Sequence, residues 1–345
     1  MDLFFVLSGF LIGGILLDAA KAERYFAPFY IRRAHRILPL YGLVLVLVYL
    51  GSYTIGQTQP MNSFVENRIP LTYYATFLQN FWTARHQDFG SYTLGVTWSL
   101  AIEEQFYLTL PAVIRFVGRT RLGWIAAAML VLAPVLRIVL NRSLGYGPLA
   151  SYVLMPCRLD SLGLGLAAAL LVRTPKMWDD VMRHRKHVYV ALVMAGFGVV
   201  LMLLFGFTAF TNQMLGLEYS VLAVLYFLLL LGVLTSNKLN VFFSSRVLRY
   251  MGIRAYGLYL LHFPCMVIFF LLFARIHPAQ SGWITLAASL SGIALACGLA
   301  ALSWEYLEKP LIKRGHRWNY GDSTTSAERG MINEKPAEAV ASSRG

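Results

Sequence analysis

The chain has 345 residues, of which 57% are hydrophobic and only 14% are charged. Soluble domains carry about a quarter charged residues, so this composition excludes a protein built on one large soluble core and indicates a polytopic membrane protein. A formal net charge of +13 would suggest an anionic partner in a soluble protein. In a membrane protein, basic cytoplasmic loops explain much of this charge, so no nucleic-acid partner is expected.

Long apolar runs separated by charged patches predict nine membrane-spanning helices. Each run is close to the ~20 residues that a bilayer requires, except the first, which is shorter. The predicted fold class is therefore an all-α, polytopic integral membrane helix bundle, because only a helix bundle satisfies so much backbone in hydrocarbon without alternating strands. The predicted spans are 3–17, 37–55, 98–117, 122–140, 152–172, 188–207, 217–235, 255–274 and 283–303.

The Lys and Arg residues alternate across these spans. Of the 30, 24 lie in or beside the connections after the first, third, fifth and seventh spans or in the C-terminal tail, against 5 in or beside the other connections. The positive-inside rule then predicts a cytoplasmic C-terminus and places residue 1 on the external side. The first span would thus enter from outside without a basic flank, so we expect a helix upstream of it that these residues lack. A signal peptide is the alternative, but the positive n-region is missing.

Three further features complete the organisation. The connection 56–97 is long, polar and aromatic, and a loop of this length is usually functional or a lid. A membrane domain is predicted over 1–314, followed by a disordered cytoplasmic tail over 315–345, which is rich in Ser, Ala, Glu and Gly. The cysteines fall in apolar stretches without metal-ligand spacing, so no metal is expected.

Glu103 and Glu104 place two adjacent carboxylates in the apolar run of the third span. An ionisable side chain at the centre of such a helix costs about 2.5–3.5 kcal/mol, so it is paired, faces a polar cavity or takes part in chemistry. The two side chains point about 100° apart, so only one should face a given cavity. Tyr107 shares the face of Glu103, and Trp98 is an interface anchor or a sugar-stacking platform. Both carboxylates are candidate general acids or bases; the alternative is a salt bridge to Arg158.

A basic cluster, 32–36, precedes the second span. Arg33 and Arg36 are three residues apart and hence neighbours on a helical face. Two guanidinium groups at the membrane surface suit a phosphate-bearing ligand, because each binds phosphate oxygens in a bidentate manner. The alternative is a cluster that only sets the topology.

Spans five and eight carry the remaining polar candidates. Arg158 and Asp160 lie near the external end of span five, at the depth expected for Glu103. Gly163 and Gly165 follow them and permit close helix approach. Span eight carries Tyr256, Tyr259 and His262, and the histidine is either a satisfied packing residue or a proton-transfer group.

Several of these motifs resemble, in order, those of the membrane-bound acyltransferase type 3 family. The resemblance implies transfer of an acyl group, usually acetyl from acetyl-CoA, to hydroxyls of carbohydrates such as O-antigen, exopolysaccharide or peptidoglycan. It also implies an acyl-CoA donor, a carbohydrate acceptor that is in some cases lipid-linked, and a place in the bacterial inner (cytoplasmic) membrane. The matching segments are 2–12, 29–33, 36–41, 98–107, 158–160, 256–262 and 308–310.

The resemblance also implies roles for single residues. Arg33 and Arg36 match the family's Arg-x-x-Arg pair, which implies CoA binding on the cytoplasmic side, across the membrane from the carboxylates. The family normally begins with a helix that carries an arginine and a histidine thought to be catalytic, and this helix is expected to be missing here, so the full-length form would have ten spans. The candidate catalytic residues are then Glu103, Glu104 and His262, and the candidate substrate-binding residues are Trp98, Tyr107, Arg158, Asp160, Tyr256 and Tyr259.

Two other functions stay open at this point. A transporter or flippase of a polar or glycan substrate could use the same buried charges as a pathway. Many transporters show inverted repeats and broken helices, and neither is evident in this sequence. The third possibility is an inactive, truncated acyltransferase.

Overall fold

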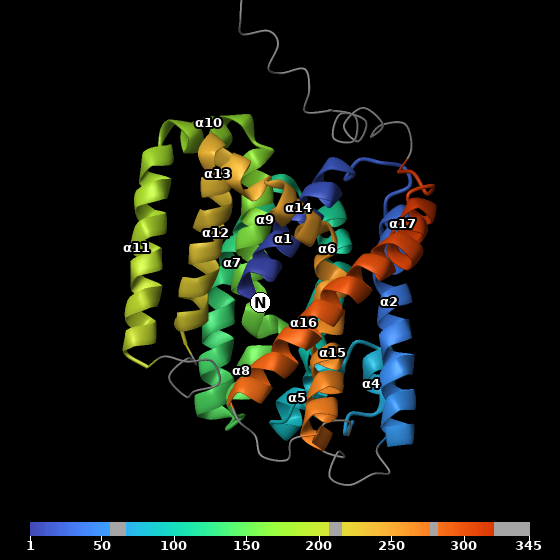
Figure 1. Cartoon of the computed structure of the whole chain (residues 1–345). Helices are drawn as coiled ribbons and strands as arrows, with labels where there is room; N and C mark the ends of the chain where they lie inside the picture. Colours follow the sequence, from blue (N-terminus) through green and yellow to red (C-terminus); the bar gives the residue numbers. More distant parts are fainter. Residues whose placement is uncertain (56–66, 207–215, 277–281, 321–345) are drawn as a thin grey trace, which may run out of the picture.

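The computed structural model describes residues 1–55, 67–206, 216–276 and 282–320. These ranges form a bundle of helices (Figure 1) and contain no strand, only an isolated antiparallel bridge between Asn67 and Ser91. Seven helices in this part of the chain are long and apolar enough to cross a membrane. The predicted all-α membrane bundle is thereby confirmed.

In the described ranges, nine helices run along the bundle and short helices lie at its two ends (Figure 1). The long helices are α1 (Asp2–Asp18), α2 (Phe26–Ile55), α6 (Trp98–Phe116), α7 (Arg119–Ile138), α9 (Leu159–Val172), α11 (Arg185–Leu204), α12 (Glu218–Thr235), α15 (Ala255–Ile276) and α16 (Gly282–Ser303). At one end lie α4 (Leu71–Ala75), α5 (Gln79–His86) and α8 (Pro148–Val153), and at the other α10 (Pro175–Arg183), α13 (Asn237–Phe243), α14 (Arg246–Ile253) and α17 (Lys309–Gly315).

The nine long helices follow the order of the nine predicted spans, but two of them are not among the seven. Helix α1 has 17 residues, and α6 carries the charged residues Glu103, Glu104 and Arg115. Both helices contact each other inside the bundle, and α1 also packs on α9 and α12. Length and composition alone therefore do not reproduce the count of nine.

Helix α2 begins at Phe26, well before the predicted start of the second span at residue 37. The basic cluster, 32–36, therefore lies within this helix, and the C-terminal segment packs against it. Arg32 Nε donates a hydrogen bond to the carbonyl of Trp318 over 3.0 Å, and its guanidinium lies 4.8 Å from the ring centroid of Tyr320. Arg33 and the following basic residues are thus inside a helix rather than in a surface loop.

The long connection between the second and third predicted spans contains short helices. Its described part, 67–97, contains α4, α5 and a 3₁₀ turn, and it buries the amides of Gln79 and Asn80. Asn80 exchanges hydrogen bonds with Gln105 of α6, which fastens the segment to the bundle. The rest of this connection lies outside the described residues. Of the predicted tail over 315–345, residues 315–320 are described and pack against α2 through Arg32, whereas 321–345 lie outside the described residues.

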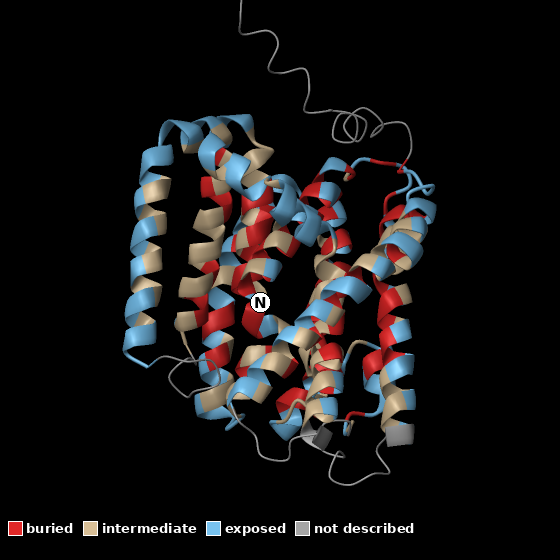
Figure 2. Cartoon of the chain, in the orientation of Figure 1, coloured by how far each residue is buried: buried red, intermediate tan, exposed pale blue. Residues whose placement is uncertain are grey.

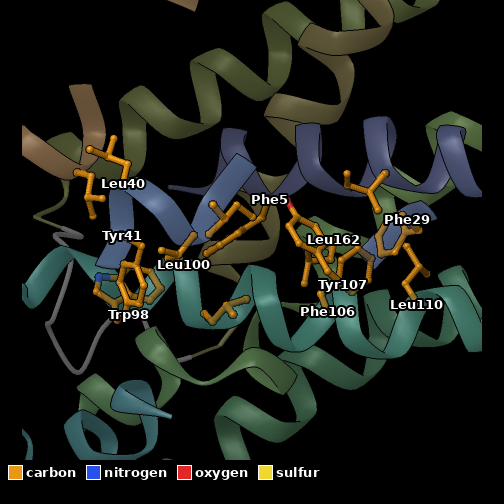
Figure 3. Close-up of a cluster of buried hydrophobic side chains, with 14 of the residues drawn as sticks. Phe5, Phe29, Leu40, Tyr41, Trp98, Leu100, Phe106, Tyr107, Leu110 and Leu162 are labelled. Carbon is orange, nitrogen blue, oxygen red and sulfur yellow. The ribbon is translucent and has the colours of Figure 1, made fainter. Parts of the chain in front are cut away.

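The main apolar core lies where α1, α2 and α6 meet (Figure 3). Phe5 of α1 contacts the ring of Trp98 edge-on, with 6.0 Å between the ring centroids, and Phe29 and Leu110 extend the cluster along α2 and α6. Helix α11, by contrast, has no buried residue and stands at the edge of the bundle (Figure 2). The polar residues of α6 thus lie inside the bundle, next to its main apolar core.

Helices α1 and α9 touch backbone to backbone. A Cβ atom on Gly9 would lie 2.2 Å from the carbonyl oxygen of Leu162, and one on Gly165 would lie 2.1 Å from that of Val6. Small residues let membrane helices approach closely, so the prediction for Gly165 is confirmed. Gly163 instead faces α7, where its Cβ would lie 2.9 Å from that of Met129. This packing fixes one face of α1 and leaves the opposite face free to form a site.

Candidate active site

A cavity of about 540 Å³ lies between α1, α2, α6 and α15, and we call it the first cavity. The free face of α1 forms one wall of it, through residues three and four apart such as Phe4, Ser8 and Leu11, as expected for one face of a helix. The other walls contribute polar groups that lie far apart in the sequence: Arg33, Arg36, Ser99, Glu103, Tyr107, Tyr256 and Tyr259.

Arg33 and Arg36 both face the first cavity, which confirms that they share a helical face. Arg33 is half-buried and Arg36 is exposed. Within the described residues neither guanidinium makes a hydrogen bond or an ion pair, whereas the neighbouring Arg32 is held by the C-terminal segment. Their donor groups are therefore available to an anionic ligand in the cavity.

Glu103 is held in the first cavity by two hydroxyl groups. Ser8 Oγ donates to its Oε1 over 2.9 Å, and the Tyr107 hydroxyl donates to its Oε2 over 3.2 Å. The same Tyr107 hydroxyl lies 3.0 Å from Ser8 Oγ, so the three side chains form a closed triangle. The prediction that Tyr107 shares the face of Glu103 is confirmed. A carboxylate oriented in this way can accept a proton from a bound substrate.

Two tyrosines of α15 complete the wall. Tyr256 donates a hydrogen bond to the carbonyl of Ile37 over 2.7 Å, which ties α15 to α2. The Tyr259 hydroxyl lies 2.7 Å from Ser99 Oγ and also donates to the carbonyl of Val96. His262, one turn further, has its Nδ1 at 2.6 Å from the carbonyl oxygen of Tyr259 and does not line the first cavity. Its catalytic role stays a prediction.

Arg158 is not paired with Glu103, so the alternative of a salt bridge between these two residues is wrong. Its Nη1 donates to Asp2 Oδ1 over 3.0 Å, and Ser161 donates to the same oxygen over 3.2 Å. The guanidinium also lies 3.9 Å from the ring centroid of Tyr219. The pair was plausible because Arg158 and Glu103 were expected at equal depth in the membrane. Helix α1, however, packs against α9 and places the carboxylate of Asp2 next to Arg158.

Asp160 belongs to a second buried ion pair. Its Oδ2 accepts from Arg137 of α7 over 2.8 Å and from Ser220 over 2.7 Å, and both charged side chains are completely buried. Neither Asp160 nor Arg158 lines the first cavity. Their predicted role in substrate binding stays a prediction, whereas their place in the packing of α1, α7, α9 and α12 is directly visible.

Trp98 is almost fully buried, at 4% exposure, rather than exposed at a membrane interface. Its ring lies 4.5 Å from that of Tyr152 and 6.0 Å from the Arg158 guanidinium, measured to ring centroids. It does not line the first cavity. The predicted interface anchor is therefore wrong, and the predicted contact with a sugar stays a prediction.

The basic pair and Glu103 line the same cavity, so the expectation that they lie across the membrane from each other is wrong. The error follows from the start of α2, because Arg33 lies seven residues inside the helix, or about 10 Å along its axis. Glu103 lies five residues inside α6, which enters from the other end, or about 8 Å. Both groups therefore lie inside the bundle, where they line the same cavity.

Four participants were missed from the sequence: Ser8 and Ser99 in the cavity wall, and Asp2 and Arg137 in the ion pairs. The two serines carry no signal of their own in an apolar helix. An available signal for the ion pairs was the balance of buried charge, because Arg158 and Asp160 each require an opposite partner. Within the described residues, no three His, Cys, Asp or Glu side chains are grouped to hold a metal ion.

Comparisons with known proteins show which family the chain resembles as a whole. A family model described as an acyltransferase domain, that of the acyltransferase type 3 family, matches residues 1–304. YrhL of Bacillus subtilis, whose name assigns it provisionally to peptidoglycan O-acetylation, is 28% identical over 92% of this chain and 51% of its own length. The peptidoglycan O-acetyltransferase OatA of Listeria monocytogenes is 29% identical over 91% of this chain and 51% of its own length.

The chain thus spans about half the length of the curated relatives it matches. A protein of Staphylococcus aureus that is provisionally named an O-acetyltransferase shows the same relation, with 26% identity over 91% of this chain and 52% of its own length. No solved structure matches the chain.

Proposed function

Because the chain belongs to the membrane-bound acyltransferase type 3 family, we propose that it transfers an acyl group, most simply acetyl, from acyl-CoA to a carbohydrate hydroxyl. The relatives named for peptidoglycan O-acetylation support a cell-surface glycan as the acceptor. We place the protein in a bacterial inner membrane with its C-terminus in the cytoplasm, because the predicted basic connections coincide with the end that carries α10, α13, α14 and α17.

The observation that supports this proposal is a pair of guanidinium groups, Arg33 and Arg36, which share one cavity with Glu103 and have no partner among the described residues. Two guanidinium groups on one helical face bind phosphate oxygens in a bidentate manner and so suit the phosphates of CoA. The cavity extends from Gly252, at the basic end, to Met1 and Ser99 in the interior, so a CoA molecule bound at its basic end could direct its thioester inward.

In the proposed reaction, Glu103 accepts the proton of the sugar hydroxyl while the sugar oxygen attacks the acyl carbon. The new carbon–oxygen ester bond forms, the carbon–sulfur bond of the thioester breaks, and the sulfur receives the proton from Glu103 to give free CoA. Ser8 and Tyr107 keep the carboxyl group aimed at the cavity. General acid–base catalysis of this kind contributes about 10²–10⁴-fold to a rate.

Donor binding is tested by titrating the purified chain with acetyl-CoA in detergent. Arg33→Ala and Arg36→Ala should each weaken binding about tenfold or more, since a hydrogen bond to a charged group contributes about 1.5–3 kcal/mol. Arg183→Ala, which removes an exposed arginine at the same end of the molecule, serves as the control and should bind normally. Equal binding by all variants, or no binding by the unmodified chain, would contradict the proposal.

Transfer itself is tested with labelled acetyl-CoA and membrane glycans from the expressing cells. The unmodified chain should move label into glycan. Glu103→Gln should lose most of the transfer while binding acetyl-CoA as before, because the amide cannot take up the proton. A glycan that gains no label from any form of the protein would argue against the acyltransferase assignment.

A further inference from the structure

A second cavity of about 390 Å³ lies on the other side of α2, between α2, α6 and the segment that follows α4. Glu104 faces it, whereas Glu103 faces the first cavity, as expected for adjacent positions on a helix. The second cavity shares Arg33, Ile37 and Tyr107 with the first. The rest of its lining has no part in the proposed donor site and includes Glu104, Gln105, Leu38, Thr76, Leu78 and Leu108.

Glu104 supplies an unused acceptor in this cavity. Its Oε1 is buried and has no hydrogen-bond partner among the described residues. The neighbouring Gln105 is already engaged, since its Nε2 donates to Phe77 O and to Asn80 Oδ1, each over 2.9 Å. A buried oxygen without a partner is costly, so a ligand that brings a donor such as a hydroxyl group would be bound there.

The rim of the second cavity is apolar and outward-facing. Leu38 on α2 and Leu108 on α6 are 47% and 68% exposed, and Leu78 at the end of the bundle is 40% exposed. Exposed leucines on the sides of membrane helices face hydrocarbon. The second cavity is therefore bounded by lipid on one side and by a carboxyl group on the other, which suits a molecule with a polar head and an apolar tail.

The two cavities share a wall made of Arg33, Ile37 and Tyr107. Only these side chains separate a ligand at Glu104 from the first cavity, where Tyr107 donates to Glu103. Resting on the proposed function, we propose that the second cavity is the acceptor site. It takes a sugar head group on an apolar tail between α2 and α6. The Glu104 carboxyl group accepts a hydrogen bond from one sugar hydroxyl, while the hydroxyl that reacts reaches Glu103 past the shared wall of Arg33, Ile37 and Tyr107.

The test uses two matched cysteine variants of the chain in phosphatidylcholine nanodiscs, in a Cys297→Ala background that removes the exposed thiol. Thr76→Cys lines the second cavity, whereas Thr72→Cys, one turn earlier on α4 and also exposed, does not. The probe is dodecyl-β-D-glucoside. It should slow maleimide labelling of Thr76→Cys about three- to tenfold, the effect of one or two hydrogen bonds on occupancy, and leave Thr72→Cys unchanged.

Two comparisons separate sugar recognition from simple lipid filling. Dodecyldimethylamine oxide has the same tail without a sugar hydroxyl and without a phosphate that Arg33 could bind, and it should not protect Thr76→Cys. Glu104→Leu should abolish the protection by the glucoside, while Glu104→Gln, which keeps an acceptor oxygen, should retain part of it. Equal protection by both amphiphiles, equal protection of both cysteines, or full protection in Glu104→Leu would overturn the proposal.

The result is also distinguishable from a failure of the donor site. Acetyl-CoA should bind Glu104→Leu at least as tightly as the unmodified chain, because Glu104 does not line the first cavity and its removal takes a negative charge away from Arg33. Absence of acetyl-CoA binding together with intact glucoside protection would overturn the proposed function and keep the second cavity as a glycolipid site. Normal acetyl-CoA binding without glucoside protection would overturn the second cavity as the acceptor site and keep the proposed function.

Discussion

At the scale of single residues, the charged side chains of the bundle interior fall into two classes. Arg137, Arg158 and Asp160 are fully buried and have a charged partner within 3.0 Å. Arg33 and Arg36 line a cavity and have no such partner in the described part of the chain. Paired buried charges hold helices together, whereas unpaired charges beside a cavity are free for a ligand. This difference assigns the first group to the framework and the second to the site.

The framework role predicts a large effect of Asp160→Asn on stability. Removing one member of a buried pair leaves Arg137 uncompensated and should cost about 3–5 kcal/mol of unfolding free energy. Asp18→Asn breaks the partly exposed pair with Arg173 and should cost about 0–1 kcal/mol. Thermal unfolding in detergent measures both. Similar losses of Tm in the two variants would contradict the framework role, and the double variant Arg137→Met with Asp160→Leu should recover much of the loss.

At the scale of elements, α1 is the helix that connects the packing to the site. Its glycine face lies against α9, and its opposite face lines the first cavity through Ser8 and its neighbours. The position of Ser8 relative to Glu103 therefore depends on how closely α1 approaches α9. A helix packed backbone to backbone has little freedom to adjust, because interiors are close-packed.

Gly165→Ala tests this dependence. The new methyl group would lie against the carbonyl oxygen of Val6, so α1 must move or the contact must be strained, at a cost of about 1–3 kcal/mol. We expect a lower Tm together with weaker acetyl-CoA binding. Gly298→Ala is the matched control, since nothing lies within 4 Å of its added methyl group. A drop in Tm with unchanged acetyl-CoA affinity would show that the packing of α1 against α9 does not control the shape of the first cavity.

At the scale of the whole molecule, the short helices divide by charge. At the end with α10, α14 and α17, each of these helices carries at least two Arg or Lys residues. Helices α4, α5 and α8 together carry Arg85 as their one basic residue besides His86. This asymmetry orients a membrane protein during insertion because basic loops stay in the cytoplasm. In the orientation that we propose, the basic end of the first cavity faces the cytoplasm, where acyl-CoA is made.

Reporter fusions test this orientation in a bacterial host. A green fluorescent protein fused to the C-terminus should be fluorescent, and alkaline phosphatase at the same position should be inactive. The phosphatase inserted after Gly145, at the opposite end of the bundle, should be active because it reaches the oxidising external side. The opposite pattern at both positions would contradict the proposed orientation, because Arg33 and Arg36 would then lie toward the external side, where CoA could not reach them.

The sequence by itself determined the class of the protein, the order of its long helices and the local neighbours on each helix. Apolar runs of bilayer length allow no other architecture, and helical spacing alone places Arg33 beside Arg36 and Tyr107 beside Glu103. The class and the helix order follow from the lengths of the apolar runs, and neighbours on a helix follow from spacing within that helix. The amino-acid sequence is therefore enough to predict them.

Only the tertiary structure decided which helices share a cavity and which charge pairs with which. It joined Arg158 to Asp2 rather than to Glu103, placed Arg33 and Arg36 in one cavity with Glu103, and separated Glu103 from Glu104 into two cavities. The physical reason is that depth along a helix says nothing about rotation around its axis or about its neighbours. Both are set by packing between distant segments, here by the contact of Gly9 with Gly165.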